Sequence, residues 1–307
     1  MNNPITIVIP AYNRAQTLAR TLRSIGGQTV APARVILVDN GSTDSSLRLM
    51  EEWASRQSRM EVLVLSESKR GACAARNRGL QEVETEFVMF FDSDDEMQPS
   101  HVADFTDAIS LHPDTDIFGR DIITVGLDGK RRTLYFSDRD VMFSHLFRGC
   151  LSTQRMVIRT SLVREAGGWN EDIPVWNDFE LGARLLLASK RVRQLGGAPS
   201  VVTYQQAQSI TGTSFKEKAG LWERTLDRME SVFTENGRQN LVKWLDCRRM
   251  ILAAHYRMEG AHELSDRLHD NVVAKGRSPR RLKLVYAHNL RFRRLTWVFA
   301  KFLFLFR

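Results

Sequence analysis

The sequence is poor in cysteine, and its three cysteines, Cys73, Cys150 and Cys247, lie far apart without a C-x-x-C pair. This pattern argues against a disulfide scaffold or a zinc site and is typical of a reducing compartment. The seven histidines show no ligand spacing such as H-x-x-x-H. A zinc centre built from side chains alone is therefore not expected.

The N-terminus lacks the features of a secretory signal. Residues 1–4 carry no basic side chain and lead into no long apolar run. The chain also lacks low-complexity tracts, and 43% of its 307 residues are hydrophobic. This composition is sufficient for one sizeable α/β domain with an appendage.

Acidic residues are missing from the C-terminal end. Residues 275–307 contain ten Lys or Arg and no Asp or Glu, whereas the rest of the chain has 34 basic and 36 acidic residues. The net charge of +8 therefore belongs to this tail alone. Because the remainder is nearly neutral, we expect no nucleic-acid partner.

Short apolar runs open the chain and predict buried parallel strands. They lie at residues 5–10, 35–39, 61–65 and 87–91. Amphipathic stretches typical of helices separate them, at residues 14–26, 45–56 and 71–82. This alternation predicts a doubly wound α/β fold with a mostly parallel sheet.

The pattern after residue 100 is more varied. It predicts helices over residues 100–112, 138–147 and 181–189, strands over 116–125, 156–158 and 201–204, and a hairpin turn at 127–130. From residue 214 the pattern is helical throughout. We therefore expect an α/β catalytic domain over residues 1–213 and a helical extension over residues 214–307.

Polar residues follow three of the predicted strands. In chain order they are Pro10, Ala11, Tyr12, Asn13 and Arg14, then Asp39, Asn40 and Gly41, then Asp92, Ser93, Asp94 and Asp95. The carboxyl ends of parallel strands share one edge of a sheet, where such folds bind ligands. The three clusters are therefore expected to form one site.

The acidic cluster places three carboxylates, Asp92, Asp94 and Asp95, within four residues. Unpaired, these groups would raise one another's pKa, and a divalent cation such as Mg²⁺ or Mn²⁺ would relieve the repulsion. The alternative is a solvated acidic turn or the cap of the helix that follows.

Two further features have both a binding and a structural interpretation. The carboxylate of Asp39 could accept hydrogen bonds from a nucleobase or ribose, or it could close an Asx turn. The small residues from Gly71 onward could admit a diphosphate to the helix N-terminus, or they could serve tight helix–sheet packing.

Taken together, these segments resemble the family 2 glycosyltransferases of the GT-A fold. The matching segments are residues 7–14, 38–44, 71–79, 91–95, 167–171 and 176–181, in the order of that family. The resemblance extends from the N-terminus to about residue 213. It implies an inverting transfer of a sugar from a nucleotide diphosphate donor, with UDP favoured over GDP or dTDP.

The resemblance also implies roles for residues. Pro10, Tyr12 and Asp39 would contact the base and ribose, Arg76 and Asn77 would face the donor, and Asp94 would ligate the metal together with Asp92. Some relatives use a later histidine as a ligand, but residues 204–212 contain none.

Asp178 matches the family's catalytic base, which would take the proton of the acceptor hydroxyl. Asn177 stands where the family usually has Glu, which leaves Glu180 as a rival base unless it orients Arg184. The alternative for Asp178 is a helix cap. Trp176 is either an acceptor-stacking residue or part of the core, and Asn177 would lie beside it at the acceptor site.

The tail interleaves its basic residues with aromatic and leucine side chains and ends in an apolar stretch over residues 297–306. Ten residues are too few to span a bilayer, but the pattern is typical of a helix at an anionic membrane surface. The alternative is a helix docked on its own domain or in a dimer. We expect a cytoplasmic enzyme on the inner face of the membrane, with a saccharide or lipid-linked saccharide as acceptor.

Two other functions remain open at this stage. A sugar nucleotidyltransferase would carry a basic Gly-rich loop after the first strand, where this chain has residues 10–14. A non-catalytic nucleotide-binding scaffold at the membrane would not need a base such as Asp178.

Overall fold

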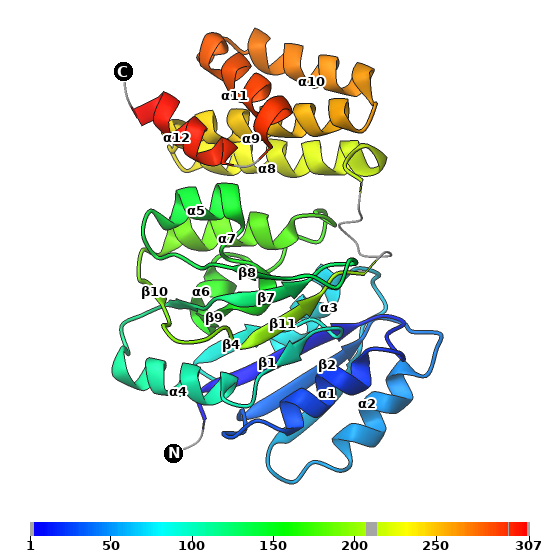
Figure 1. Cartoon of the computed structure of the whole chain (residues 1–307). Helices are drawn as coiled ribbons and strands as arrows, with labels where there is room; N and C mark the ends of the chain where they lie inside the picture. Colours follow the sequence, from blue (N-terminus) through cyan, green and yellow to red (C-terminus); the bar gives the residue numbers. More distant parts are fainter. Residues whose placement is uncertain (1–2, 207–213, 294, 306–307) are drawn as a thin grey trace. The chain divides into compact units, whose positions relative to one another are not determined.

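The computed structural model of the protein describes residues 3–206, 214–293 and 295–305 (Figure 1). The described residues form two compact units. The first runs to residue 206 except for residues 146–148, and the second comprises those three residues and the chain from 214 onward. The predicted boundary at residue 213 falls in 207–213, outside the described residues.

A seven-stranded sheet forms the centre of the first unit, in the order β10-β6-β9-β4-β1-β2-β3. Its strands in chain order are β1 (Ile5–Ala11), β2 (Arg34–Asp39), β3 (Glu61–Ser66), β4 (Phe87–Phe90), β6 (Ile117–Gly119), β9 (Met156–Arg159) and β10 (Val192–Gln194). Strands β1 to β4 pair in parallel, whereas β9 runs antiparallel to both β4 and β6. The predicted mostly parallel, doubly wound sheet is confirmed.

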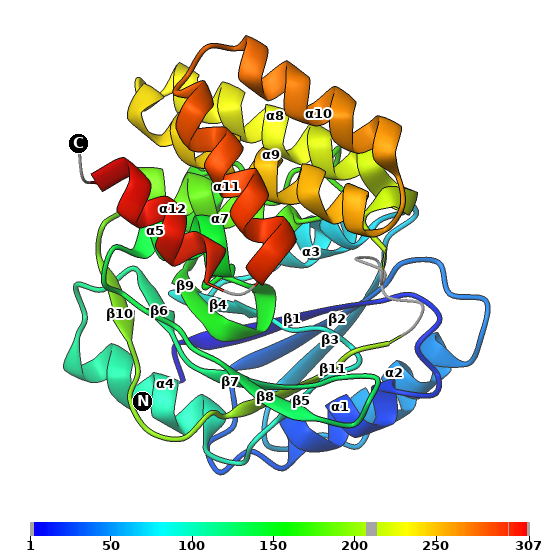
Figure 2. The ribbon, with the colours of Figure 1, turned by 45° about the horizontal axis from the view of Figure 1, so that its top comes forward.

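Helices cover both faces of this sheet, as Figure 2 shows. One face packs against α1 (Leu18–Gly26), α2 (Ser46–Ala54) and α4 (His101–Leu111). The other packs against α3 (Ala72–Gln81), α6 (Thr160–Glu165) and α7 (Asn177–Ala188). Successive residues of β1 point to opposite faces, so Ile7 and Ile9 join the first core and Val8 joins the second.

Gly79 allows α3 to lie close to the sheet. A Cβ atom at this position would come within 2.4 Å of Cγ1 of Val8 on β1. Any larger residue would push α3, and the site residues that it carries, away from the strand.

The strand predicted over residues 116–125 is wrong as a single element, because the chain changes sheets within it. β6 ends at Gly119, and β7 (Ile122–Val125) belongs to a second sheet, with the order β5-β11-β7-β8. A Cβ atom at Gly119 would lie 2.0 Å from the Phe136 ring. The next residue, Arg120, is buried, pairs with Asp104 and donates to the carbonyl of Ala198. These contacts fix the bend between the strands.

The second sheet comprises β5 (Glu96–Met97), β7, β8 (Arg131–Leu134) and β11 (Val201–Tyr204). The predicted hairpin turn lies between β7 and β8, with Gly129 at a φ of 71°. The helix predicted over residues 138–147 is α5 (Val141–Arg148). The helix predicted over residues 181–189 begins earlier, at Asn177, so Asp178 lies in its first turn.

In the described part of the second unit, the regular structure is helical. It contains α8 (Ala219–Glu235), α9 (Gln239–Met258), α10 (His262–Ala274), α11 (Pro279–Phe292) and α12 (Thr296–Leu305). Helix α9 packs against α8, α10 and α11. Among the described residues, no helix has both the length and the hydropathy needed to cross a membrane.

Candidate active site

The strand register brings the predicted polar clusters to one edge of the sheet. Ala11 at the end of β1 pairs with Asp39 at the end of β2, and Asp39 pairs with Ser66 at the end of β3. Strand β4 ends beside them at Phe90, two residues before Asp92. The loops after β1, β2 and β4 therefore form one site.

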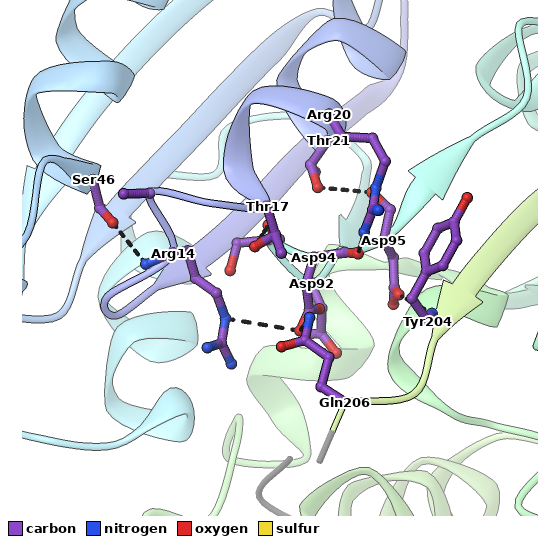
Figure 3. Close-up of polar contacts among 12 residues, drawn as sticks. Arg14, Thr17, Arg20, Thr21, Ser46, Asp92, Asp94, Asp95, Tyr204 and Gln206 are labelled. Carbon is purple, nitrogen blue, oxygen red and sulfur yellow. Dashed lines mark hydrogen bonds and ion pairs between the residues drawn. The ribbon is translucent and has the colours of Figure 1, made fainter. Parts of the chain in front are cut away.

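The loops after β1 and β2 are joined to each other by hydrogen bonds. Asn13, at a φ of 51°, accepts the backbone N–H of Thr43 at 2.8 Å and donates its own backbone N–H to the Ser42 hydroxyl. The backbone N–H of Arg14 donates to Oγ of Ser46 at 2.7 Å (Figure 3). The Asn13 side chain therefore shapes the loop.

Asp39 and Asn40 are also bonded within the site. The Asp39 carboxylate accepts the backbone N–H groups of Gly41 and Ser42, which is the Asx turn considered as its structural role. The Asn40 amide donates to the carbonyls of Glu67 and Lys69, and its oxygen accepts the N–H of Gly71 at 2.7 Å. Asn40 thus connects β2 to the start of α3.

Tyr12 is the exposed aromatic group at this edge, with 46% of its surface accessible. The guanidinium of Arg70 lies 4.5 Å from the centre of its ring. Pro10 and Ala11 are buried in β1. Of this segment, Tyr12 offers the largest open flat surface for a planar ligand such as a base.

Helix α3 places Arg76 directly against the acidic cluster. Its Nη2 donates to Oδ1 of Asp92 at 2.7 Å, and its guanidinium lies 4.3 Å from the Trp169 ring centre. Nε and Nη1 are buried and have no hydrogen-bond partner among the described residues. Because unpaired buried donors are unfavourable, these N–H groups of Arg76 are suited to donate hydrogen bonds to an anionic or hydroxyl-bearing ligand.

The next residue on α3, Asn77, has a structural role. Its amide donates to the carbonyl of Trp169 and to Glu171, and its oxygen accepts the N–H of Trp169 at 2.8 Å. The family resemblance implied that Asn77 faces the donor, whereas in the structure its side chain is hydrogen-bonded to the segment containing Trp169.

The acidic cluster is compact and partly buried (Figure 3). One carboxylate oxygen from each of Asp92, Asp94 and Asp95 lies within 4.8 Å of the others. Asp95 and Ser93 are buried, so the cluster is not a solvated turn. It is not a helix cap either, since β5 separates it from α4, which Ser100 caps.

The electrostatics of the cluster follow from burial and mutual repulsion. Burial, together with the charge of Asp92, raises the pKa of Asp94 to about 6, although Arg14 partly offsets the shift. Burial and the charges of Asp92 and Asp94 raise the pKa of Asp95 well above its usual range. Bringing a cation here would favour the ionised forms of both groups.

The arrangement fits a divalent cation. The oxygen-only set of Asp92, Asp94 and Asp95 suits Mg²⁺ or Mn²⁺. Oδ2 of Asp94 lies 3.7 Å from Nε of Arg14 and accepts from Gln206 at 3.0 Å.

Several residues that the sequence analysis did not assign support the cluster. Arg20 lies 3.8 Å from the Tyr204 ring centre and donates to the carbonyl of Asp94. The backbone N–H of Tyr204 donates to Oδ1 of Asp95 at 3.0 Å. Gln154 donates to both Asp92 and Asp95. Most of these contacts join segments far apart in sequence, so no local spacing could have signalled them.

Asp178 is half-buried in the first turn of α7. Its Oδ1 accepts the backbone N–H of Phe179 at 2.8 Å, and Trp176, not Asp178, caps the helix. Burial raises the pKa of Asp178, while the charges of Arg76 and Asp92 act on it in opposite directions. A carboxylate with a raised pKa near the acidic cluster has the properties of a general base.

Glu180 is fully buried and paired with Arg184 through two hydrogen bonds, of 2.9 and 2.6 Å. Arg184 also donates to the carbonyls of Ala166 and Gly168. The structure thus shows Glu180 orienting Arg184, and this pair anchors α7 to the loop that Asn77 binds from α3.

Trp176 and Asn177 lie directly before Asp178. Trp176 is half-buried at a φ of 52°, and its ring centre lies 5.7 Å from that of Phe179. Asn177 is also half-buried. The positive φ of a bulky residue is strained and turns the chain sharply into α7.

The fold is that of an α/β protein whose polar loops gather at the carboxyl edge of its sheet. Residues 6–164, a little over half of the chain, match the family described as glycosyl transferase family 2. The chain belongs to that family, which places it among the transferases of glycosyl groups.

The chain is also similar in sequence to individual glycosyltransferases. The chain is 32% identical over 94 residues to a cholesterol galactosyltransferase of Borreliella burgdorferi. The matched segment covers 31% of this chain and 26% of that protein. The chain therefore matches only about a quarter of the length of this relative.

Two solved structures share the fold. The S. aureus TarS fragment 1-349 in complex with UDP-GlcNAc aligns with a TM-score of 0.62 at 18% identity, over 95% of this chain and 93% of that one. A mannosyltransferase of Pyrobaculum calidifontis in complex with GDP-Man and Mn²⁺ aligns with a TM-score of 0.57 at 16% identity, over 99% and 85%. The predicted GT-A fold is confirmed.

Proposed function

We propose that this protein is a metal-dependent, inverting glycosyltransferase that takes a sugar from a nucleotide diphosphate donor. The observation that carries this proposal is the partly buried carboxylate cluster at the edge of the sheet, with Arg76 and Asp178 beside it. Family membership supports the reaction class.

In this proposal the donor lies along the edge between Tyr12 and Asp94. The base would stack on Tyr12, and the ribose would approach Asp39. Asp94 and Asp92 would hold Mg²⁺ or Mn²⁺, with Asp95 as a further carboxylate of the cluster. The cation, when bound, would stabilise the negative charge of the leaving diphosphate.

Asp178 acts as the general base. It takes the proton from an acceptor hydroxyl while the hydroxyl oxygen forms a bond to the anomeric carbon of the donor sugar. The bond from that carbon to the diphosphate oxygen breaks, and the diphosphate leaves with the electron pair. A single displacement inverts the anomeric centre. Arg76 is placed to bind the donor through its unpaired nitrogens, and Trp176 and Asn177 would border the acceptor.

We favour UDP as the nucleotide. The TarS structure contains UDP-GlcNAc and the mannosyltransferase structure contains GDP-Man with Mn²⁺, so both donor types occur on this fold.

The acceptor proposed is a saccharide or lipid-linked saccharide reached from a membrane surface, on the inner face of the cell membrane. In the second unit, α12 presents an exposed apolar face with Val298, Phe302 and Leu305, and the exposed Leu295 directly precedes this helix. Ten basic residues and no acidic ones lie between 275 and 307. Such a surface suits anionic lipid.

Other aromatic side chains of the tail pack within the unit. Phe299 stacks on His288 with ring centres 4.3 Å apart, and Phe304 meets Trp244 edge-on at 5.6 Å. Phe306 lies outside the described residues. The proposed membrane contact therefore involves one face of the tail and not its whole apolar content.

The function is tested by incubating the protein with a panel of UDP-, GDP- and dTDP-sugars, with and without Mn²⁺, and following nucleoside diphosphate release. A metal-dependent release from one donor is expected. Proton NMR of the transferred product should then show the inverted anomer. Retention of configuration would contradict the single-displacement mechanism, and no release from any donor would favour a non-catalytic scaffold.

A further inference from the structure

The antiparallel strand β9 brings one more residue to the ligand edge of the sheet. β9 runs opposite to β4, with Phe87 paired to Arg159 and Val88 to Ile158. The residues that precede β9 therefore lie where β4 ends, beside the acidic cluster. A short 3₁₀ turn, Thr153–Arg155, occupies this place and carries Gln154.

The turn that carries Gln154 is firmly held. Its neighbours Thr153 and Arg155 are both buried. Arg155 donates to the carbonyls of Leu134 and Gly149, and its own carbonyl accepts the N–H of Arg120 at 3.0 Å. Gln154 is thus presented to the cluster from a backbone fixed on both sides.

The Gln154 amide bridges two carboxylates. Its Nε2 donates to Oδ2 of Asp92 and, at 2.7 Å, to Oδ2 of Asp95. A primary amide has two N–H groups, so these two bonds use its full donor capacity. The remaining oxygens of the two carboxylates are held by Arg76 and by the backbone of Tyr204. Both carboxylates are therefore fixed at both oxygens.

A neutral donor is well suited to this position. Asp92 and Asp95 have carboxylate oxygens within 4.8 Å of each other, so their negative charges repel. Hydrogen bonds from the two N–H groups of one amide reduce this repulsion. A lysine or arginine would do the same, but its charge would also repel an incoming cation. A glutamine aligns the carboxylates and leaves their negative charge available.

We propose that Gln154 is a positioning residue that holds Asp92 and Asp95 in the geometry for binding a divalent cation. This inference rests on the proposed metal dependence. Gln154 acts through the carboxylates, as outer-shell residues do when they orient metal ligands. Loss of such an outer-shell residue typically lowers metal affinity about 10–100-fold.

The test uses the full chain and Mn²⁺ alone, with no donor present. Mn²⁺ affinity is measured by electron paramagnetic resonance titration for wild type, Gln154→Leu, Gln154→Glu and Asp94→Ala. Gln194→Leu, at an exposed glutamine of β10, serves as the matched control. Thermal unfolding of each variant with and without Mn²⁺ provides a second readout.

Gln154→Leu should weaken Mn²⁺ binding about 10-fold or more, while Gln194→Leu should bind like wild type. Gln154→Glu adds a fourth carboxylate, so its Tm should fall without Mn²⁺ and rise more than the wild-type Tm when Mn²⁺ is added. If Gln154→Leu loses stability but keeps the wild-type Mn²⁺ affinity, Gln154 has only a structural role and the inference is wrong. If wild type and Asp94→Ala bind Mn²⁺ equally, the proposed metal site fails, and this inference fails with it.

Discussion

Arg76 and Asp92 form a partly buried ion pair in which Nη2 of the arginine donates to Oδ1 of the aspartate at 2.7 Å. The pair uses only one edge of the guanidinium, because Nε and Nη1 have no partner among the described residues. The arginine therefore keeps unpaired N–H groups directly beside the acidic cluster. In the proposed function, these N–H groups bind diphosphate or sugar oxygens of the nucleotide sugar.

Arg76→Lys keeps the charge but removes the forked set of donors. We expect the affinity for the donor, or for UDP with Mn²⁺, to fall about tenfold or more, since hydrogen bonds to charged groups contribute about 1.5–3 kcal/mol. Isothermal titration calorimetry measures this directly. Arg78→Lys, on the same helix but paired with Glu82, is the control and should bind normally. Equal affinity in both variants would remove Arg76 from the donor site.

Mn²⁺ binding should depend on pH through Asp94, whose pKa is raised to about 6. A protonated carboxyl is a poor ligand, so affinity should fall as the pH decreases through about 6. Asp94→Asn should bind Mn²⁺ weakly at every pH in this range. A wild-type affinity that is constant from pH 5 to pH 8 would contradict the raised pKa.

Asp178→Asn preserves the shape of the side chain and removes the proton acceptor. Turnover should fall about 10²–10⁴-fold, whereas donor affinity should barely change. Because burial raises the pKa of Asp178, the acid limb of the wild-type pH–rate profile should lie above the ordinary aspartate value. Activity should be lost as the pH falls through that pKa. Normal turnover by Asp178→Asn would exclude this residue as the base.

Glu180→Gln tests the rival base and should give a different result. It breaks a buried ion pair with Arg184, so the free energy of unfolding should decrease by about 3–5 kcal/mol. The turnover of the molecules that remain folded should stay close to wild type, measured below the lowered Tm. If turnover is lost while the stability is unchanged, Glu180 and not Asp178 is the base.

The exposed face of α12 predicts membrane binding that point substitutions can test. Phe302→Ser with Leu305→Ser removes two exposed side chains, and co-flotation with anionic vesicles should decrease while donor hydrolysis is retained. Truncation after residue 275 is unsuitable, because it would also remove Leu282 and Val285, which are buried within the unit. If the double variant floats like wild type, this face does not contact lipid.

The sequence allowed the order of the first strands and helices to be predicted because buried parallel strands are continuous apolar runs. Residues 5–10 and 87–91, for example, correspond to β1 and β4. Residues 116–125 have the sequence pattern of a single strand because they are apolar on both sides of Gly119 and Arg120, although they form β6 and β7. The bend there depends on Phe136 and Ala198, which lie far away in sequence.

Contacts between residues far apart in sequence also decided which parts of the site could be predicted. Asp92 and Asp94 were predicted as a pair because they lie two residues apart and follow an apolar strand. Gln154 and Gln206 carry no local signal, and their contacts with the cluster depend on where β9 begins and β11 ends. Asn77 was expected to face the donor, but only tertiary structure shows that its amide is bonded to Trp169 and Glu171.

The proposed function requires, above all, that the acidic cluster binds the donor through a metal. The direct measurement is the rate of nucleoside diphosphate release from the preferred nucleotide sugar by wild type and Asp94→Ala, each with Mn²⁺ and with a chelator. We predict that Mn²⁺ stimulates wild type strongly, that the chelator abolishes release, and that Asp94→Ala is equally slow in both conditions. Wild-type release that persists in the chelator, or Mn²⁺ stimulation that survives in Asp94→Ala, would contradict metal-dependent donor binding at this cluster.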